Sequence, residues 1–436
     1  MKPVDRPEKL PTLIKGLLKS HPASGQLWVG FSGGLDSTVL LHLLVTCQVP
    51  VRALHIHHGL NANADIWLAH CKEFAENLAV PFTAIQVTVD YKDGGLEQGA
   101  RRARYAAFNQ VMSEGDQILL GHHADDQAET FLLRLMRGAG VLGLASMSES
   151  RTIGDGKYLL RPLLGAGRKE LEQWAEAHGL SWIEDDSNAD EALERNFLRH
   201  RVVPLLNQRW GVSRQIARAA ENLRESADLL SELALADLEE ADLKVERFGE
   251  SLALPRFFSF SEGRRKNIMR HWVLRQGGQP PESALLNQAL FQVTHAAEDA
   301  QPEVNLGGCV VRRFRNRLYL TPELAPIANN SDKSWHWDGR SNLALPAGGI
   351  LRPSSDWPVD DYRVCYRRGG ERAHPVNRSR SQTLKKLLQE WALEPWLRDR
   401  VPLVFLGDDL VAVAGLFSCK AGCAIPDEPP GWRFFD

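Results

Sequence analysis

The sequence lacks a long hydrophobic run, a paired cysteine motif and an excess of positive charge. It contains no apolar run of the roughly 18 residues that a membrane-spanning helix needs, so we expect no membrane span. Residues 1–21 contain acids and prolines but no apolar core of signal-peptide length, which predicts a cytoplasmic protein. The formal net charge of −3 excludes a uniformly basic nucleic-acid-binding protein but leaves room for a local basic face.

Six cysteines are scattered along the chain, and none forms a C-x-x-C pair. A disulfide framework or a zinc knuckle would need paired spacing, so we interpret the cysteines as reduced thiols of a cytosolic protein. The one C-x-x-x-C spacing has no partner pair nearby, which makes metal binding there the minor alternative. The cysteines are Cys47, Cys71, Cys309, Cys365, Cys419 and Cys423.

Expected strands and helices alternate in the amino-terminal part of the chain. Short apolar runs ended by glycine or polar residues predict buried strands, and apolar residues at helical spacing predict the helices between them. Alternation at this spacing specifies a parallel, doubly wound α/β sheet. The strands are expected at 26–32, 51–58, 81–89 and 116–123, and the helices at 36–47, 63–79, 95–115 and 125–138.

Clusters of unusual polar residues follow three of these strands. They are Ser32–Ser37, His55–His58 and His122–Asp126, and each stands at the carboxyl end of its strand. Doubly wound sheets bind their ligands at that edge. The sequence therefore predicts a ligand site where these clusters meet.

The first cluster, S-G-G-L-D-S, is similar to a phosphate loop but lacks the usual lysine. A Gly-Gly turn between strand and helix aims backbone N–H groups and the helix dipole at an anion. A bare carboxylate would repel phosphate, so Asp36 indicates a bridging Mg²⁺ and a reaction in which ATP loses pyrophosphate. A plain glycine turn is the alternative that this specific pattern disfavours. The candidate ATP ligands are Ser32, Gly33, Gly34, Leu35, Asp36 and Ser37.

Two further elements offer ATP contacts. In H-I-H-H-G, we assign His57 to packing against adenine or ribose, and interpret its histidine neighbours as polar ends of a strand. A zinc site would need ligands from several elements. Arg101 and Arg104 lie three residues apart on one helix face, where they are placed to neutralise phosphate. A solvated helix face is the alternative for the two arginines.

The segment G-H-H-A-D-D-Q-A-E-T concentrates the most charge. Asp126 and Glu129 share one face of the helix that starts there, which indicates Mg²⁺ binding or a base for an attacking amine. Acids in a first turn also serve as mere complements to the helix dipole. Further along, Asn188 is a hydrogen-bonding candidate, and Arg195 and Arg199 stand one turn apart.

The motifs in their order resemble a known family. S-G-G-L-D-S alone is similar to the PP-loop ATP pyrophosphatase superfamily, which forms adenylates of several kinds of substrate. Adding H-I-H-H-G, R-P-L-L (161–164), E-D-D-S-N (184–188) and R-N-F-L-R (195–199) narrows the resemblance to the tRNA(Ile)-lysidine synthetase family. The resemblance covers residues 20–210 and 345–420 and is faint between 215 and 325.

The resemblance implies a reaction and roles for the candidate residues. ATP and Mg²⁺ would adenylate the wobble cytidine of a CAU-anticodon isoleucine tRNA, and L-lysine would then displace AMP to give lysidine. Asp36 and Asp126 would lie near the metal, with Asp126 chosen as the proton-transfer base. Asp36, Asp126, Glu129 and Arg199 would be catalytic, and Asn188, Arg195 and Arg199 would bind lysine or the activated base. ATP would also contact His57 and Arg104.

The order of expected elements, together with the resemblance, divides the chain. After the long helical stretch that ends near residue 244, helices and short strands are expected to continue to about 322. Residues 1–213 would form the PP-loop catalytic domain, 214–325 a mainly helical tRNA-binding domain and 345–436 a small α+β tRNA-binding domain. The polar stretch within 326–344 reads as a linker. Dimers occur in the family, so a homodimer is an open expectation.

A local excess of basic residues supports tRNA binding by the last domain. Residues 363–386 contain eight basic residues and one acid, an excess that suits contact with a phosphate backbone. A solvated basic face is the alternative. The candidate tRNA ligands are Arg368, Arg372, Arg378, Lys385 and Lys386.

Three other functions compete with lysidine synthesis. A PP-loop tRNA thiolase would need a sulfur-carrying cysteine pair, and an amide-forming ligase would need an ammonia source; neither is evident. A tRNA-binding protein without activity would not need the intact acids of the loop.

Overall fold

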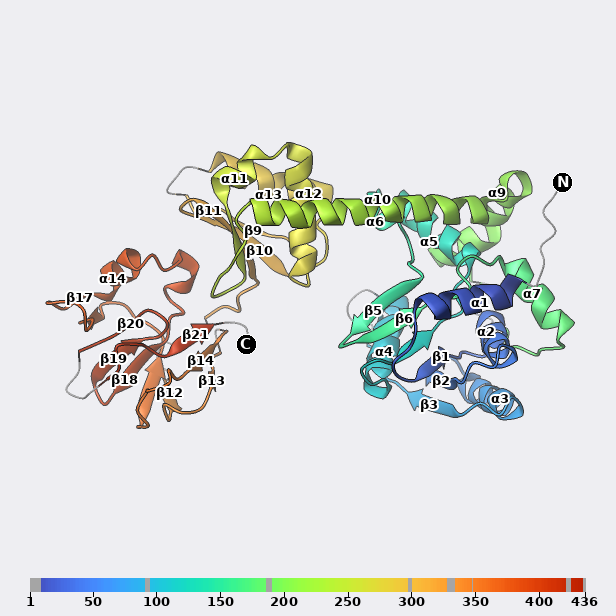
Figure 1. Cartoon of the computed structure of the whole chain (residues 1–436), viewed down its shortest axis with the longest axis horizontal. Helices are drawn as coiled ribbons and strands as arrows, with labels where there is room; N and C mark the ends of the chain where they lie inside the picture. The colour runs from blue at the N-terminus through green and yellow to red at the C-terminus, as the bar shows by residue number, and fades with distance from the viewer. Residues whose placement is uncertain are drawn as a thin grey trace. The chain divides into compact units, whose positions relative to one another are not determined.

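The computed structural model describes residues 9–90, 95–185, 190–296, 300–327, 334–346, 348–420 and 425–433 (Figure 1). The chain forms two compact units, Met1–Asp228 and Leu229–Asp436. Over the described ranges, no helix combines the length and apolar character that crossing a membrane requires.

The first unit contains the predicted doubly wound sheet. Its strand order is β3-β2-β1-β4-β6-β5, and every neighbouring pair is parallel except β5 and β6. The expected strands are confirmed with shorter bounds, and the antiparallel β5–β6 hairpin extends one edge. The strands are β1 Leu27–Gly30, β2 Arg52–His57, β3 Phe82–Gln86, β4 Gln117–Leu119, β5 Ser150–Gly154 and β6 Lys157–Leu160.

Helices cover both faces of this sheet (Figure 1). Successive strand residues point to opposite faces, so Val29 packs in the cluster with α1, α2 and α7, while Trp28 packs in the cluster with Phe108 of α4. The helices are α1 Lys9–Ser20, α2 Leu35–Thr46, α3 Ala64–Asn77, α4 Gly95–Val111, α5 Ala124–Met136, α6 Val141–Leu144, α7 Arg168–Ala177, α8 Glu194–Phe197 and α9 Val203–Trp210, with a π-helical turn at Leu198–Val202.

The middle of the chain contains a sheet as well as helices. Helix α10, Val212–Glu240, is one continuous helix that begins in the first unit and ends in the second. The short strands expected among the helices of 214–325 form a five-stranded antiparallel sheet whose order is β7-β8-β11-β10-β9. The elements after α10 are β7 Lys244–Val245, β8 Glu250–Ala253, α11 Leu254–Ser259, α12 Glu262–Arg275, α13 Ser283–His295, β9 Glu303–Asn305, β10 Cys309–Phe314 and β11 Arg317–Pro322.

The carboxyl-terminal part is rich in short strands. Its five-stranded sheet has the order β12-β15-β18-β19-β20, with two smaller sheets beside it. The helix α14 and the antiparallel pair β18–β19 belong to this α+β region. The elements are β12 Ser334–Trp337, β13 Leu343–Ala344, β14 Ile350–Arg352, β15 Tyr362–Cys365, β16 Arg372–Ala373, β17 Gln382–Thr383, α14 Leu384–Glu390, a 3-10 turn Pro395–Leu397, β18 Leu403–Leu406, β19 Asp409–Val413, β20 Phe417–Ser418 and β21 Gly431–Arg433.

Part of the segment expected to be a linker belongs to this carboxyl-terminal fold. Strand β12 pairs antiparallel with β15, so residues 334–337 are not a structureless connection. The physical reason is Trp337, which is buried and packs against Trp357 and Tyr362. The polar residues around it in the sequence concealed this apolar anchor.

Candidate active site at the carboxyl edge of the sheet

The loop between β1 and α2 approaches its neighbours closely. Gly33 has a φ of +83°, and a Cβ there would lie 2.5 Å from Ile183 Cδ1 and 2.7 Å from Cys71 Sγ. The N–H of Ile183 donates to the Gly33 carbonyl at 2.9 Å, so residues 180–185 close one side of the loop. Only glycine fits this position without displacing those side chains.

Hydroxyl groups fix the shape of the loop from within. The Ser32 N–H donates to Ser37 Oγ at 3.3 Å, and Ser37 Oγ–H donates to the Gly34 carbonyl at 3.0 Å. Gly34 is the N-cap of α2 and supplies no side-chain cap, so N–H groups of the first turn stay open toward an anion. The loop residues predicted to hold ATP therefore form an uncapped helix N-terminus, an arrangement that suits a phosphate group.

The turn before α5 lies against this loop. A Cβ on Gly121 would lie 2.8 Å from the Asp36 carbonyl oxygen, which shows how closely the two segments approach. His123 follows as the N-cap of α5 and is almost fully buried. Its Nε2 lies 3.5 Å from both Asp36 Oδ1 and Asp126 Oδ2, and its Nδ1 lies 3.6 Å from Asp125 Oδ2. His123 thus joins two carboxylates that the sequence analysis assigned to one site.

Carboxylates surround the His123 ring. Burial lowers the pKa of His123, but the carboxylates of Asp126, Asp125 and Asp36 outweigh burial and raise this pKa well above its usual value. Nδ1 accepts the backbone N–H of Asp125 at 3.2 Å, so the ring hydrogen lies on Nε2, which faces Asp36 and Asp126.

Four charged side chains form a compact ion-pair network beside the turn. Arg195 Nε donates to Glu129 Oε2 at 2.7 Å, and Arg199 Nε donates to Glu129 Oε1 at 2.6 Å. The Nη2 atoms of both arginines donate to Asp126 Oδ1, at 3.1 and 3.2 Å. Glu129 is 1% exposed, so its charge is almost completely enclosed. The structure therefore brings together the acids and arginines that the sequence assigned separately.

Asp126 is a weak base in this setting. Burial raises the pKa of Asp126, but His123 and Arg195 outweigh it and lower the pKa to about 2. The Oδ2 atom of this carboxylate accepts a hydrogen bond from the backbone N–H of His123 at 3.0 Å. A carboxylate with so low a pKa is a poor base near neutral pH. It is better suited to supplying a fixed negative charge that orients its neighbours.

Asp36 is the acid that best fits a cation. Its Oδ1 is buried and has no hydrogen-bond partner within the described residues, whereas both oxygens of Asp126 accept hydrogen bonds. A buried carboxylate oxygen without a donor is the group that a hard cation such as Mg²⁺ satisfies. Over the described residues, no group of three or more metal-ligating side chains occurs, so phosphate oxygens and water would have to complete the shell.

Three more histidines lie near the site and differ in their surroundings. Burial and Arg104 lower the pKa of His58 to about 4, and burial lowers that of His122 to about 4 despite Asp126. His122 Nδ1 accepts a hydrogen bond from Arg161 Nε at 3.2 Å, which leaves its Nε2–H as a donor. His57 is the last residue of β2 and is buried. Its Nε2 lies 3.0 Å from Asp65 Oδ1 of α3.

Arg104 is a partly desolvated cation without a paired acid among the described residues. Burial and the charge of Arg101 lower the pKa of Arg104, and Arg195 adds to this effect. Clustered cations that repel one another favour an anionic ligand between them. Asn188, the remaining predicted lysine ligand, lies outside the described residues.

The predicted tRNA ligands of the second unit are more loosely held. Arg378 pairs with Glu390 at 2.9 Å, and Lys386 lies 3.9 Å from the same acid. Arg372 Nη2 donates to the Ser381 carbonyl at 3.0 Å. Glu390 lies just beyond the basic window counted in the sequence, so the local excess of positive charge is smaller than the count indicated. Arg368 and Lys385 are also exposed.

Several residues of the site escaped the sequence analysis. His123 lies in a quoted motif but received no role, and Arg161 lies in the R-P-L-L motif that was quoted only for resemblance. Asp125 lies in G-H-H-A-D-D-Q-A-E-T, and its place in the first turn of a helix indicates by itself no more than a complement to the helix dipole. The sequence feature that could have pointed to His123 and Asp125 is H-H-A-D-D, in which two neighbouring histidines are followed after one residue by two neighbouring acids.

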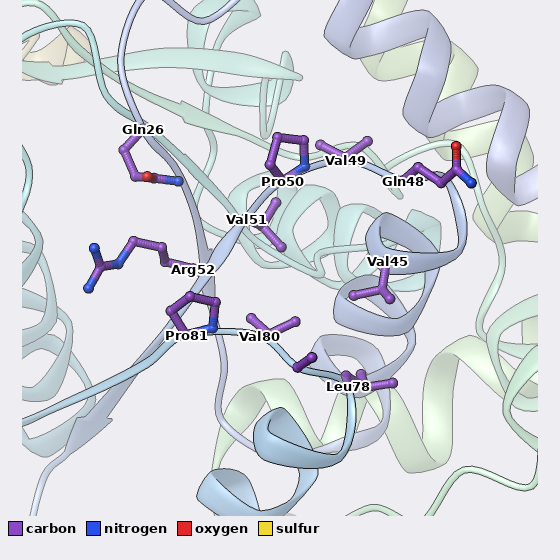
Figure 2. A pocket seen from close by; sticks show the side chains of 11 residues that line it. Gln26, Val45, Gln48, Val49, Pro50, Val51, Arg52, Leu78, Val80 and Pro81 are labelled. Carbon is purple, nitrogen blue, oxygen red and sulfur yellow. The ribbon is translucent and has the colours of Figure 1, made fainter.

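A separate groove lies at the opposite edge of the sheet and carries no such chemistry (Figure 2). Its volume is about 460 Å³, and its lining residues come from the end of α2, the segments that lead into β1, β2 and β3, and the first residue of β2. The lining has no acid and no histidine. It comprises Gln26, Val45, Gln48, Val49, Pro50, Val51, Arg52, Leu78, Ala79, Val80 and Pro81.

Comparison with known proteins defines the class first. A PP-loop domain matches residues 8–206, a TilS substrate binding domain matches 252–319 and a TilS substrate C-terminal domain matches 362–434. With the doubly wound sheet and its S-G-G-L-D-S loop, these matches place the chain among the PP-loop enzymes that use ATP.

Full-length relatives then define the family. The tRNA(Ile)-lysidine synthase of Coxiella burnetii is 38% identical over 98% of this chain and 96% of its own length. That of Serratia proteamaculans is 40% identical over 96% of this chain and 97% of its own. The chain belongs to the tRNA(Ile)-lysidine synthase family and is therefore a tRNA-modifying ligase.

Among solved structures, the U34-tRNA thiolase NcsA of Methanococcus maripaludis, which holds a 4Fe-4S cluster, has a TM-score of 0.44 and 19% identity. The match covers 50% of this chain and 79% of that protein. In the present chain, the thiol beside the loop is Cys71, and burial raises its pKa to about 12. A thiol this reluctant to ionise is a poor sulfur carrier, so the thiolase alternative finds no chemical support at the loop.

Proposed function

We propose that the protein joins L-lysine to C2 of the wobble cytidine in the CAU anticodon of isoleucine tRNA. In the first step, the O2 atom of the cytosine attacks the α-phosphorus of ATP and pyrophosphate leaves. In the second step, the ε-amino group of lysine attacks C2, the C2–O2 bond breaks and AMP leaves with that oxygen. The products are lysidine, AMP, pyrophosphate and a proton, and the tRNA changes from reading AUG to reading AUA.

The observation that carries the proposal is the pairing of an open phosphate loop with an enclosed network of acids and arginines. The uncapped first turn of α2 suits the phosphates of ATP, with Ser32 and Ser37 holding the loop in shape. Arg104 is placed to bind an anion because it lacks a paired acid among the described residues. His57 would contribute to the nucleoside side of the site, since it lies at the carboxyl end of β2.

Mg²⁺ fits the loop through Asp36, whose Oδ1 has no hydrogen-bond partner among the described residues. The ion would neutralise the charge that develops on the departing pyrophosphate. We assign Asp126 to orienting the site through His123 and the arginines, because its oxygens already accept hydrogen bonds.

The network around Glu129 suits recognition of lysine. Asp126 and Glu129 would attract the ammonium end of the amino acid, while Arg195, Arg199 and Asn188 would bind its carboxylate or the adenylated base. Charged groups enclosed at this depth are preorganised, so little rearrangement is needed when the transition state forms.

The basic residues of the second unit suit the tRNA backbone. Arg368, Arg372, Arg378, Lys385 and Lys386 would contact phosphates, while the wobble base enters the site after leaving its stack. We also propose a cytoplasmic location, where tRNA is modified and translated. A homodimer is a further proposal, to be tested by the mass of the protein in solution.

Incubation with ATP, radiolabelled lysine and an unmodified isoleucine tRNA transcript with a CAU anticodon tests the proposal. We expect label in that tRNA and little in elongator methionine tRNA, which has the same anticodon. Failure to label the isoleucine transcript, with the protein folded and saturated with substrates, would contradict the proposed function.

A further inference from the structure

Helix α10 begins inside the catalytic unit, directly beside the first turn of α5. Ser213, in the first turn of α10, donates its hydroxyl hydrogen to Asp125 Oδ1 at 2.6 Å. The other carboxylate oxygen of Asp125 accepts the backbone N–H of Arg168, at the start of α7, at 2.8 Å. Asp125 therefore ties the starts of three helices together.

The carboxylate of Asp125 is firmly oriented. Each oxygen accepts a separate donor, which fixes the rotation of the carboxylate about its Cβ–Cγ bond. The backbone N–H of Asp125 donates to His123 Nδ1 at 3.2 Å, so the residue that Ser213 holds in place also sets the direction of the imidazole.

Further bonds keep the start of α10 in register. Ser213 is 6% exposed, and its Oγ also accepts a hydrogen bond from Asn207 Nδ2 at 3.2 Å. Arg214 lies 3.5 Å from Glu170 of α7. Three turns later, Arg224 Nη2 donates to the Ala145 carbonyl at 2.8 Å and to the Met147 carbonyl, which also accepts from Gln127 of α5. These contacts prevent α10 from sliding or rotating relative to α5.

We infer that Asp125 and Ser213 are positioning residues for the reaction, linking the start of α10 to the imidazole of His123. This inference rests on the proposed function, since it concerns the rate of the same reaction. Asp125 orients His123, and His123 in turn holds the carboxylates of Asp36 and Asp126 on either side of its Nε2. Ser213 contributes by holding Asp125 in place.

The physical consequence of breaking this link is misplacement of the two carboxylates. Without the Ser213 hydroxyl, Asp125 Oδ1 loses its donor, and the carboxylate is free to turn further toward His123. A shift of about 1 Å in a group that orients substrates is sufficient to lower a rate by roughly 100-fold. Affinity for ATP and tRNA does not depend on this orientation to the same extent, so the effect is expected in kcat.

Ser213→Ala tests the inference, with Ser226→Ala as its matched control. Ser226 is an exposed serine of the same helix, and its hydroxyl bonds only to the Asn222 carbonyl at 3.0 Å. The measurements are the rate of lysine transfer at saturating ATP, lysine and tRNA, and the Kd for ATP and for tRNA. We expect Ser213→Ala to lower kcat about 10- to 100-fold and to change each Kd by less than about twofold.

Recovery of kcat by a residue that keeps the hydroxyl group distinguishes a positioning role of Ser213 from a merely structural one. Ser213→Thr retains a hydroxyl and should recover kcat to within about fivefold of the original protein, while Ser226→Ala should equal it. If Ser213→Ala does not fold, Asp125→Asn tests the same link, because an amide has one acceptor oxygen for two donors.

An unchanged kcat in the folded Ser213→Ala protein, or no recovery with threonine, would overturn the inference. An unchanged kcat in folded Asp125→Asn would overturn it as well. A different result, in which the original protein fails to label isoleucine tRNA, would overturn the proposed function itself.

Discussion

The catalytic unit and the carboxyl-terminal region both rely on charged side chains, but they surround those charges differently. Glu129 is 1% exposed and accepts hydrogen bonds from Arg195 and Arg199. Lys385 and Lys386 on α14 are exposed, and the acid nearest to Lys386 lies 3.9 Å away. The first arrangement is fixed in geometry, whereas the second is free to adapt to its ligand.

This difference follows from the two tasks. Chemistry at a single atom gains from charges held in a low-dielectric setting, because they need no reorganisation in the transition state. Contact with a phosphate backbone gains from exposed cations, since binding releases counterions and does not need one fixed geometry. Each prediction below tests whether the two regions differ in this way.

The largest effect is expected for Asp36→Asn. Loss of this charge beside the phosphate loop should lower lysidine formation by about 1,000-fold, because metal and phosphate would lose their carboxylate partner. The unfolding temperature should fall modestly, because Asp36 Oδ1 also lies 3.5 Å from the buried His123 ring. Asp228→Asn, an exposed acid of α10, is the control. Residual activity above about one tenth of the original would contradict the assignment.

Glu129→Gln should reduce both activity and stability. Two arginines would be left partly buried without their shared carboxylate, which costs about 3 kcal/mol of unfolding free energy. The matched control is Glu191→Gln, because Glu191 pairs with Arg201 at 2.9 Å on the surface. That change should cost less than about 1 kcal/mol. Equal losses for the two variants in denaturant unfolding would remove the distinction between enclosed and exposed charges.

Acid should weaken the enclosed network through Asp126. Its pKa is about 2 in the folded protein and 3.8 ordinarily, so its contribution is fully present above pH 4 and is lost as the pH falls toward 2. We expect the free energy of unfolding of the original protein to fall more steeply across this window than that of Asp126→Asn. The difference amounts to roughly 2 kcal/mol. Parallel pH curves would show that Asp126 is not stabilised by its neighbours.

The smallest effect is expected for the double change Lys385→Ala and Lys386→Ala. Losing two phosphate contacts should weaken tRNA binding about tenfold and reduce the slope of log Kd against log salt by about 1 to 2. The Kd for ATP should stay constant. Arg378→Ala is a useful comparison, because Arg378 already pairs with Glu390 and should contribute less than an exposed lysine. An unchanged salt slope in the double variant would contradict tRNA contact at α14.

Sequence patterns predicted the fold of the catalytic unit because its signals are local. The strands and helices from β1 to α5 alternate at clear spacings, and the S-G-G-L-D-S loop falls between β1 and α2 as expected. Strand β12 was missed because its anchor, Trp337, stands among polar residues. In the middle region, the sequence predicted short strands among helices but not their pairing into one sheet, because that pairing joins residues far apart in the chain.

The sequence predicted many of the residues that form the site, but not which of them pair with one another. Asp126, Glu129, Arg195 and Arg199 were all candidates, yet no spacing shows that the arginines pair with the acids across 66 to 73 residues of chain. The bond between Ser213 and Asp125 spans 88 residues, and one ordinary serine gives no pattern to detect. Such long-range pairings become visible only when the fold brings the elements together.

Separate measurement of the two chemical steps tests the account most directly. Pyrophosphate release is followed with ATP and isoleucine tRNA in the absence of lysine, and labelled lysine is then added to measure transfer. We predict that Asp36→Asn blocks both steps, whereas Glu129→Gln, compared at a temperature where it is folded, releases pyrophosphate but transfers lysine at least about 100-fold more slowly. Equal loss of both steps in Glu129→Gln would contradict the division of labour between the phosphate loop and the enclosed network.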